Sequence, residues 1–95
     1  MAQLEYERAV ELLEAELGDE LVALSVEDGN CFGFNAVATS VWRALDVPRS
    51  LEELRDRLLS EYEVPPEQCV RELEELLRDL VERKLVRTHV RSDFG

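Results

Sequence analysis

Few residues in this chain are of types that commonly carry out catalysis, and their spacing does not bring them together. The sequence contains one histidine, His89, and two cysteines, Cys31 and Cys69. No Cys-x-x-Cys or His-x-x-x-His pair occurs, so these three residues make a poor zinc site, and we expect neither a metal nor a cofactor. His89 lies in an alternating segment near the C-terminus, where a solvated histidine is a better interpretation than a general base. We therefore predict that the protein is not an enzyme and has no catalytic residues.

The other chemically suggestive residues also have simpler interpretations. Carboxylates between residues 52 and 79 alternate with arginines, which is typical of a solvated helix face stabilised by ion pairs. The two cysteines are expected to be reduced and partly buried, because a lone disulfide is unusual in a protein without secretion signals. Gly29 and Gly33 lack the third glycine and the Gly-Lys-Ser/Thr ending of a phosphate-binding loop. They fit a hairpin turn and a strand position that permits a close approach.

Composition sets limits on fold class and partners. Ninety-five residues form one domain, residues 1–95, and 45% hydrophobic with 35% charged residues is typical of a globular protein. No apolar run is long enough to span a bilayer and no cleavable signal peptide is visible, so we expect a cytoplasmic protein without a membrane partner. The net charge of −11 repels phosphate backbones and disfavours nucleic acid as a partner.

The central part of the chain must join a hairpin directly to a helix. Residues 21–26 follow a strand pattern, Asp28-Gly29 predicts a two-residue hairpin turn, and residues 31–34 form the returning strand. From residue 37 to residue 45 the apolar residues recur at helical spacing, and Asn35 is placed to cap that helix. We predict the helix over residues 35–45, ending before Pro48.

Two further helices follow. Ser50 and Glu53 form a capping-box pattern that predicts the start of the second helix. The third and longest helix begins at Pro65-Pro66, where proline is tolerated in the first turn. Its wide apolar stripe over residues 69–81 is consistent with contacts on two sides. Residues 84–90 form either a short closing strand or a frayed tail.

The first segment has two interpretations. Residues 4–17 fit a helical stripe closed by Gly18, yet residues 10–17 also fit a strand paired with residues 20–26 across Gly18-Asp19. We favour the strand, because tertiary context often overrides propensity.

The order of these features resembles a known family. The run Gly29-Asn30-Cys31-Phe32-Gly33-Phe34-Asn35, followed by an Ala-x-x-apolar-Trp pattern ending at Trp42, resembles the PqqD-like precursor-peptide recognition domains. It is most similar to the stand-alone B1 proteins of lasso-peptide biosynthesis, and the likeness covers residues 20–87. The resemblance implies an α+β domain of winged helix-turn-helix type, in which a small antiparallel three-stranded sheet is followed by three helices.

The resemblance also implies a binding mechanism and a binding site. In such domains the leader segment of a ribosomally made precursor peptide adds as a strand to the third strand, in a groove walled by the third helix. Carried over to this chain, the peptide-binding residues are Asn30, Cys31, Phe32, Gly33, Phe34, Val70, Leu73, Glu74, Leu77, Arg78 and Leu80. The protein would present the bound precursor to a maturation enzyme such as a leader peptidase, and would be a monomer when unbound.

Strand alternation refines this expectation. Phe32 and Phe34 share one face of their strand, and Cys31 and Gly33 share the other. We predict Phe34 and Trp42 in the core. We also predict that Leu77→Asp weakens peptide binding by about tenfold or more without unfolding the domain.

Three alternatives remain open. A winged-helix regulator would bind DNA through the third helix, but that helix carries more acidic than basic residues. A PqqD-type peptide chaperone for a radical SAM enzyme would share the groove and differ only in its partner. A small homodimer would pair its exposed strand edges.

Overall fold

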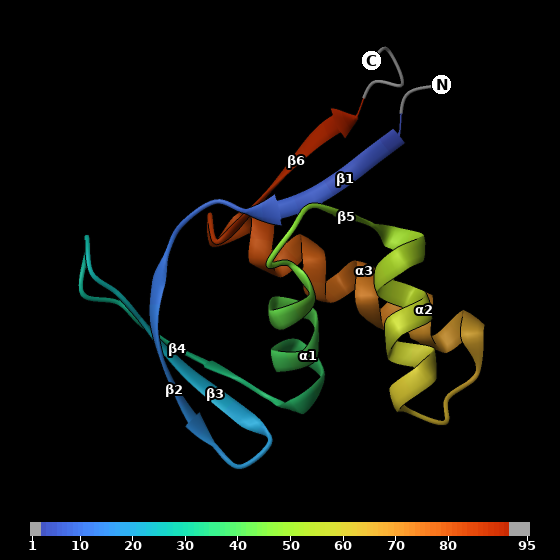
Figure 1. Cartoon of the computed structure of the whole chain (residues 1–95), viewed down its shortest axis with the longest axis horizontal. Helices are drawn as coiled ribbons and strands as arrows, with labels where there is room; N and C mark the ends of the chain where they lie inside the picture. Colours follow the sequence, from blue (N-terminus) through green and yellow to red (C-terminus); the bar gives the residue numbers. More distant parts are fainter. Residues whose placement is uncertain (1–2, 92–95) are drawn as a thin grey trace.

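The structure, a computed structural model, describes residues 3–91. Two small antiparallel sheets and three helices make up this part of the chain (Figure 1). In chain order the elements are β1 (Gln3–Arg8), β2 (Leu12–Leu17), β3 (Glu20–Ser25), β4 (Cys31–Phe34), α1 (Ala36–Ala44), β5 (Arg49–Ser50), α2 (Leu51–Glu61), α3 (Pro66–Glu82) and β6 (Val86–Arg91).

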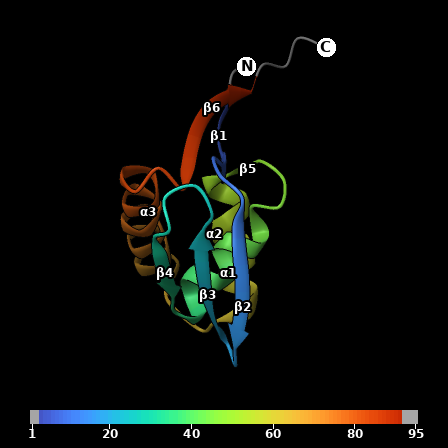
Figure 2. The same ribbon diagram turned by 90° about the vertical axis from the view of Figure 1, so that its left-hand side faces the viewer.

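The first sheet has the order β2-β3-β4 and lies against the helices on one face only (Figures 1 and 2). This confirms the predicted three-stranded sheet followed by three helices, and it confirms the strand interpretation of residues 12–17. Gly18, at φ +64°, makes the tight β2–β3 turn. The predicted two-residue turn at Asp28-Gly29 is wrong.

The loop between β3 and β4 is longer because local hydrogen bonds stabilise a wider turn. Gly29 has a positive φ of +76°, as expected, but its N–H donates to the Ser25 carbonyl at 2.9 Å. The Asn30 N–H donates to the Asp28 carboxylate at 3.1 Å. The pKa of the Asp28 carboxyl is lowered, mainly by the hydrogen bond from the Asn30 backbone and secondarily by the Ser25 hydroxyl. Residues 26–30 therefore form the loop, and β4 spans Cys31–Phe34, which confirms the predicted returning strand.

A second sheet, of order β5-β1-β6, was not predicted. β1 pairs with β6 along its whole length, from Gln3 opposite Arg91 to Arg8 opposite Val86. The C-terminal segment is thus a strand and not a frayed tail. Its pairing places His89 beside Glu5, with Nε2 3.2 Å from a carboxylate oxygen, so the expectation of a solvated histidine is wrong.

The helices begin where the capping signals predict. The Asn35 side chain accepts a hydrogen bond from Ala38 N–H at 2.9 Å, which satisfies a free donor at the start of α1. Ser50 and Glu53 form the reciprocal capping box of α2. Pro66 occupies the first turn of α3, where its missing N–H has no intrahelical partner to lose.

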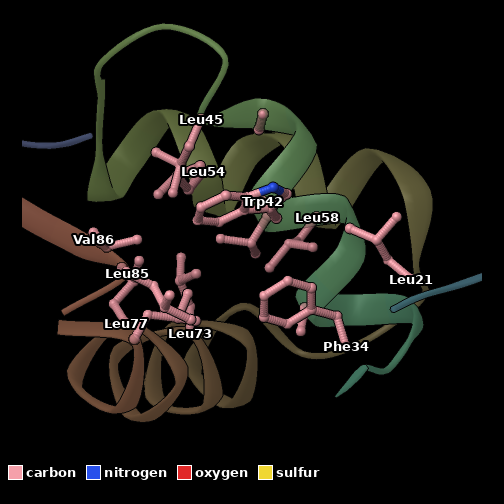
Figure 3. Packing of buried hydrophobic residues seen from close by; sticks show 14 of the residues in the cluster. Leu21, Phe34, Trp42, Leu45, Leu54, Leu58, Leu73, Leu77, Leu85 and Val86 are labelled. Carbon is pink, nitrogen blue, oxygen red and sulfur yellow. The ribbon is translucent and has the colours of Figure 1, made fainter. Parts of the chain in front are cut away.

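Trp42 of α1 lies at the centre of the core (Figure 3). Its side chain is fully buried and stacks on Phe34 with the ring centroids 5.6 Å apart, which confirms the prediction that both residues are core. The Arg8 guanidinium lies over the Trp42 ring, 4.6 Å from its centroid, and the indole N–H donates to Glu14 at 3.0 Å. Leu73 and Leu77 of α3 close the core from the helical side (Figure 3).

Candidate functional site

The free edge of β4 is the first component of the site. β4 pairs with β3 on one side, and no strand within residues 3–91 pairs with its other side. An unpaired edge exposes a row of N–H and C=O groups that can bind another strand. Natural proteins commonly protect such edges with charged side chains, but β4, Cys-Phe-Gly-Phe, has none. β2, at the other edge of the sheet, carries Glu14 and Glu16.

The register identifies which groups are free on β4. The Ser25 N–H donates to the Asn30 carbonyl at 2.8 Å in the pair that precedes β4. Hydrogen-bonded pairs alternate along an antiparallel ladder, so every second residue of β4, starting with Phe32, turns its N–H and C=O toward β3. Cys31 and Gly33 therefore turn theirs toward the free edge. Two residues can thus offer backbone hydrogen bonds to an incoming strand.

Gly33 is not a residue that the fold itself demands. Its φ lies outside the left-handed region, and a Cβ built there would meet no atom within 4 Å. The glycine instead leaves the edge unobstructed, which favours the close approach of another backbone.

Helix α3 provides the second component, a wall facing the edge of β4. A cleft of about 210 Å³ lies between β4 and α3. Figure 2 shows the two elements on the same side of the molecule. From β4 and the start of α1 the cleft is lined by Phe32, Gly33, Phe34, Asn35 and Ala38, and from α3 by Leu76, Asp79, Leu80 and Arg83. The cleft therefore combines a strand edge with a lining of both apolar and polar side chains.

The structure brings together only part of the predicted set. Phe32, Gly33, Phe34 and Leu80 line the cleft. Cys31 lies on the same strand but faces outward and is exposed, while Asn30 belongs to the preceding loop.

The other predicted residues of the third helix lie elsewhere. Leu73 and Leu77 are each only 1% exposed and belong to the core, so their placement in the groove wall is corrected. Val70 lines a shallow hollow between α2 and α3. Glu74 and Arg78 are exposed and do not line the cleft.

The helical wall is thus rotated from the predicted one. Leu73, Leu77 and Leu80 form the stripe that packs on the core, whereas Leu76, Leu80 and Arg83 form the neighbouring stripe that faces β4. Helical spacing in the sequence identified the stripe but could not tell which of its edges faces the sheet. Leu76, an apolar residue at the margin of the stripe, is the feature of the sequence that could have indicated the wall facing β4; it is half-buried and lines the cleft.

One ion pair lies at the cleft wall. Arg83 Nε is 3.0 Å from a carboxylate oxygen of Asp79, and both side chains are about half exposed. Exposed pairs of this kind contribute little stability, on the order of 0.5 kcal/mol. Either partner is therefore available to bind a charged group on a ligand at small cost.

A larger cavity of about 970 Å³ lies on another part of the molecule, where the link from β1 to β2 meets the β3–β4 and α1–β5 loops. Its acidic lining includes Glu7, Glu11, Glu14, Glu27 and Asp46. It is open, and it lacks the uncharged strand edge of the β4–α3 cleft. We therefore assign the candidate site to the smaller cleft, because chemistry and not size distinguishes the two.

Neither a metal centre nor a membrane span is found in the described part of the chain. Residues 3–91 contain no group of three His, Cys, Asp or Glu residues arranged to hold a metal ion. No helix in this range combines the length and apolar composition needed to cross a bilayer. His89 lies on the sheet of β1 and β6, with Glu5 and Glu7 on either side of its ring.

Comparisons with known proteins agree with this geometry. The sequence model of the coenzyme PQQ synthesis protein D (PqqD) family matches residues 20–86, which contain the β3–β4 hairpin and all three helices. A solved structure, TbiB1 in complex with the TbiA(beta) leader peptide, is similar with a TM-score of 0.75 and 30% sequence identity. The similarity covers 85% of this chain and 94% of TbiB1. No curated protein sequence matched the chain significantly.

Proposed function

The protein belongs to the PqqD family, and we propose that within it this chain captures the leader segment of a ribosomally made precursor peptide. The observation that carries the proposal is the uncharged, unpaired edge of β4 facing α3 across a cleft. The similarity to TbiB1, a protein solved with a leader peptide bound, supports it.

The proposed mechanism is strand addition. The leader pairs with β4 and accepts and donates hydrogen bonds at Cys31 and Gly33, which gives affinity with little dependence on sequence. Side chains of the leader alternate, so every second one enters the cleft. There Phe32 and Leu76 offer apolar contact, and Asp79 and Arg83 offer charge. These contacts select among leaders.

The protein is proposed to act without chemistry of its own. It would raise the concentration of precursor at a maturation enzyme, for which weak and reversible binding suffices. The resemblance to stand-alone lasso-peptide proteins supports a leader peptidase as that enzyme. A cytoplasmic location fits this role, because precursor and enzyme would meet there.

Paired substitutions on α3 test the cleft. We expect Leu76→Gln to weaken binding of a fluorescent leader by about tenfold, or about 1.4 kcal/mol, because it removes an apolar contact from the cleft wall. The leader is the synthetic peptide encoded by the small open reading frame nearest to this gene, and anisotropy gives its Kd.

Val81→Gln is the matched control. Val81 is an exposed apolar residue of the same helix that does not line the cleft, so its substitution should leave the Kd unchanged. Glutamine is a good helix former in both variants. Equal affinities for the wild-type chain and a folded Leu76→Gln would remove this cleft from the site. Binding of duplex DNA in place of the leader would favour the alternative function, a winged-helix regulator that binds DNA.

A further inference from the structure

Strand β2 turns two glutamates toward the helices and two leucines toward solvent. A strand packed on helices normally turns apolar side chains inward and polar ones toward solvent. On the face of β2 that is turned toward the helices, Leu12 packs against the core, and Glu14 accepts a hydrogen bond from Trp42 Nε1 at 3.0 Å. Glu16, on the same face, has a 69% exposed side chain and pairs with Arg43 at 2.5 Å. Leu13 and Leu17 point the other way and are 61% and 64% exposed. Two glutamates of β2 therefore make polar contacts with α1, while two leucines on the opposite face of the strand are exposed to solvent.

The same outward face is apolar across all three strands. Register places Leu24 between Leu13 and Cys31, and places Val22 between Ala15 and Gly33. Figure 2 looks onto this face, with the three helices behind the sheet. No element of residues 3–91 covers it. The outer face, as we call it, consists of Leu13, Ala15, Leu17, Val22, Leu24 and Cys31, with Gly33 at its edge.

A contiguous apolar surface of this kind normally marks an interaction site. Several large apolar residues are exposed in the described chain, and four of them lie together on the outer face: Leu13, Leu17, Val22 and Leu24. Only Glu20, at the end beside the β2–β3 turn, interrupts it with a charge. The face therefore fits a protein partner with an apolar patch of its own.

Charge around the outer face restricts the partner further. Asp19 and Glu20 lie at one end, and Glu27 and Asp28 at the other, all exposed. No Lys or Arg occurs in residues 9–42. Stacking two copies of the face would bring these acidic ends together, which like-charge repulsion opposes. A partner whose apolar patch is bordered by Lys and Arg is complementary instead.

We propose that the outer face is the docking surface for the enzyme that processes the bound precursor, a protein with an apolar patch bordered by basic residues. The proposal rests on the proposed function. A leader strand paired with β4 becomes the fourth strand of this sheet, and its outward side chains lie beside Cys31 and Gly33 on the same face. An enzyme seated there contacts scaffold and precursor together and distinguishes the loaded protein from the empty one.

A double substitution on β2 tests the proposal. Leu13→Lys with Leu17→Lys places two charges on the outer face, two strands or about 10 Å from β4. The assay uses the precursor and the candidate leader peptidase encoded near this gene, both purified. We expect leader affinity to be unchanged and the rate of leader cleavage at sub-saturating enzyme to fall about tenfold or more, since docking would bury two lysine charges without partners.

The control is Val90→Lys, the same kind of change at a 62% exposed residue of β6, on the other sheet. It should retain both leader binding and cleavage. Wild-type cleavage rates in the folded double variant would overturn the docking proposal. Loss of leader affinity in the double variant would also overturn it, because the face would then belong to the leader site.

Two measurements on the wild-type chain separate the remaining outcomes. Alkylation of Cys31, which is exposed on the outer face, should slow when the peptidase is added to the leader complex, and an unchanged rate contradicts docking. Sedimentation should give a monomer. A dimer that the two lysines dissociate would assign the face to a second copy instead. If the wild-type chain does not bind the leader at all, the proposed function fails first, and anisotropy reports this independently of cleavage.

Discussion

At the scale of single residues, the two cysteines have opposite environments. Cys31 is exposed on β4, whereas Cys69 is 3% exposed within the core. Burial, and secondarily the Glu72 carboxylate, raises the pKa of the Cys69 thiol. Because the thiolate is the nucleophile, both access and ionisation protect Cys69 from alkylation.

Iodoacetamide at mildly alkaline pH should therefore modify Cys31 and leave Cys69 intact. Peptide mapping by mass spectrometry checks this, and equal labelling of both thiols in the folded chain would contradict the placement of Cys69.

The raised pKa of Cys69 also determines how the free energy of unfolding changes with pH. Above the ordinary value of 9.0 the unfolded thiol ionises first, so the free energy of unfolding falls as the pH rises further.

Leu77 illustrates how one residue's burial changes the meaning of a mutation. The sequence placed it in the groove wall, but it is 1% exposed in the core. We now expect Leu77→Asp to unfold the protein, because a buried carboxylate without a partner costs about 4 kcal/mol or more. Circular dichroism during heating is the check. A cooperative transition at the wild-type temperature would show that this side chain is not in the core.

At the scale of elements, the end of α3 has a strained residue that can be relieved. Lys84 has φ +63°, and the hydrogen bonds from Lys84 N–H to Val81 and from Leu85 N–H to Leu80 complete a Schellman motif. Glycine adopts this conformation without a Cβ clash. Lys84→Gly should raise the free energy of unfolding by about 1 kcal/mol. Urea unfolding measures it, and a lower midpoint would count against the motif.

Local signals explain which elements the sequence could predict. Asn35 and Ser50 set helix starts through hydrogen bonds to residues three positions away, and Pro66 does so through its fixed φ, so these starts were predicted correctly. The pairing of β1 with β6 joins segments about eighty residues apart, and no local pattern encodes it. The prediction of a two-residue β3–β4 turn was wrong for another reason: Asp28 accepts a backbone hydrogen bond that stabilises a longer loop.

At the scale of the whole molecule, the strand half of the site was predictable and the helix half was not. Residues 31–34 are fixed by alternation and by the cap that follows them, so Phe34 could be placed in the core. Which edge of α3 faces β4 depends on how the helix crosses the sheet, and that depends on core packing around Trp42. Leu76 was therefore missed, and Leu73 and Leu77 took its place.

The whole fold also places the two proposed surfaces in contact with each other. β4 carries the free edge at its side and Cys31 on its outer face, so one strand takes part in both. Under the two proposals, leader binding at the edge and enzyme docking at the face would therefore be coupled through this shared strand, without a change of conformation.

Amide hydrogen exchange along β4, followed by NMR with and without saturating leader peptide, shows whether the leader adds to this strand. In the free protein the N–H groups of Cys31 and Gly33 point to the open edge and should exchange fast, while those of Phe32 and Phe34 are bonded to β3 and protected. We expect the bound leader to protect the amides of Cys31 and Gly33 and so to remove the alternation. If both amides still exchange fast at saturation, the leader does not add to this strand, and the proposed binding mode is wrong.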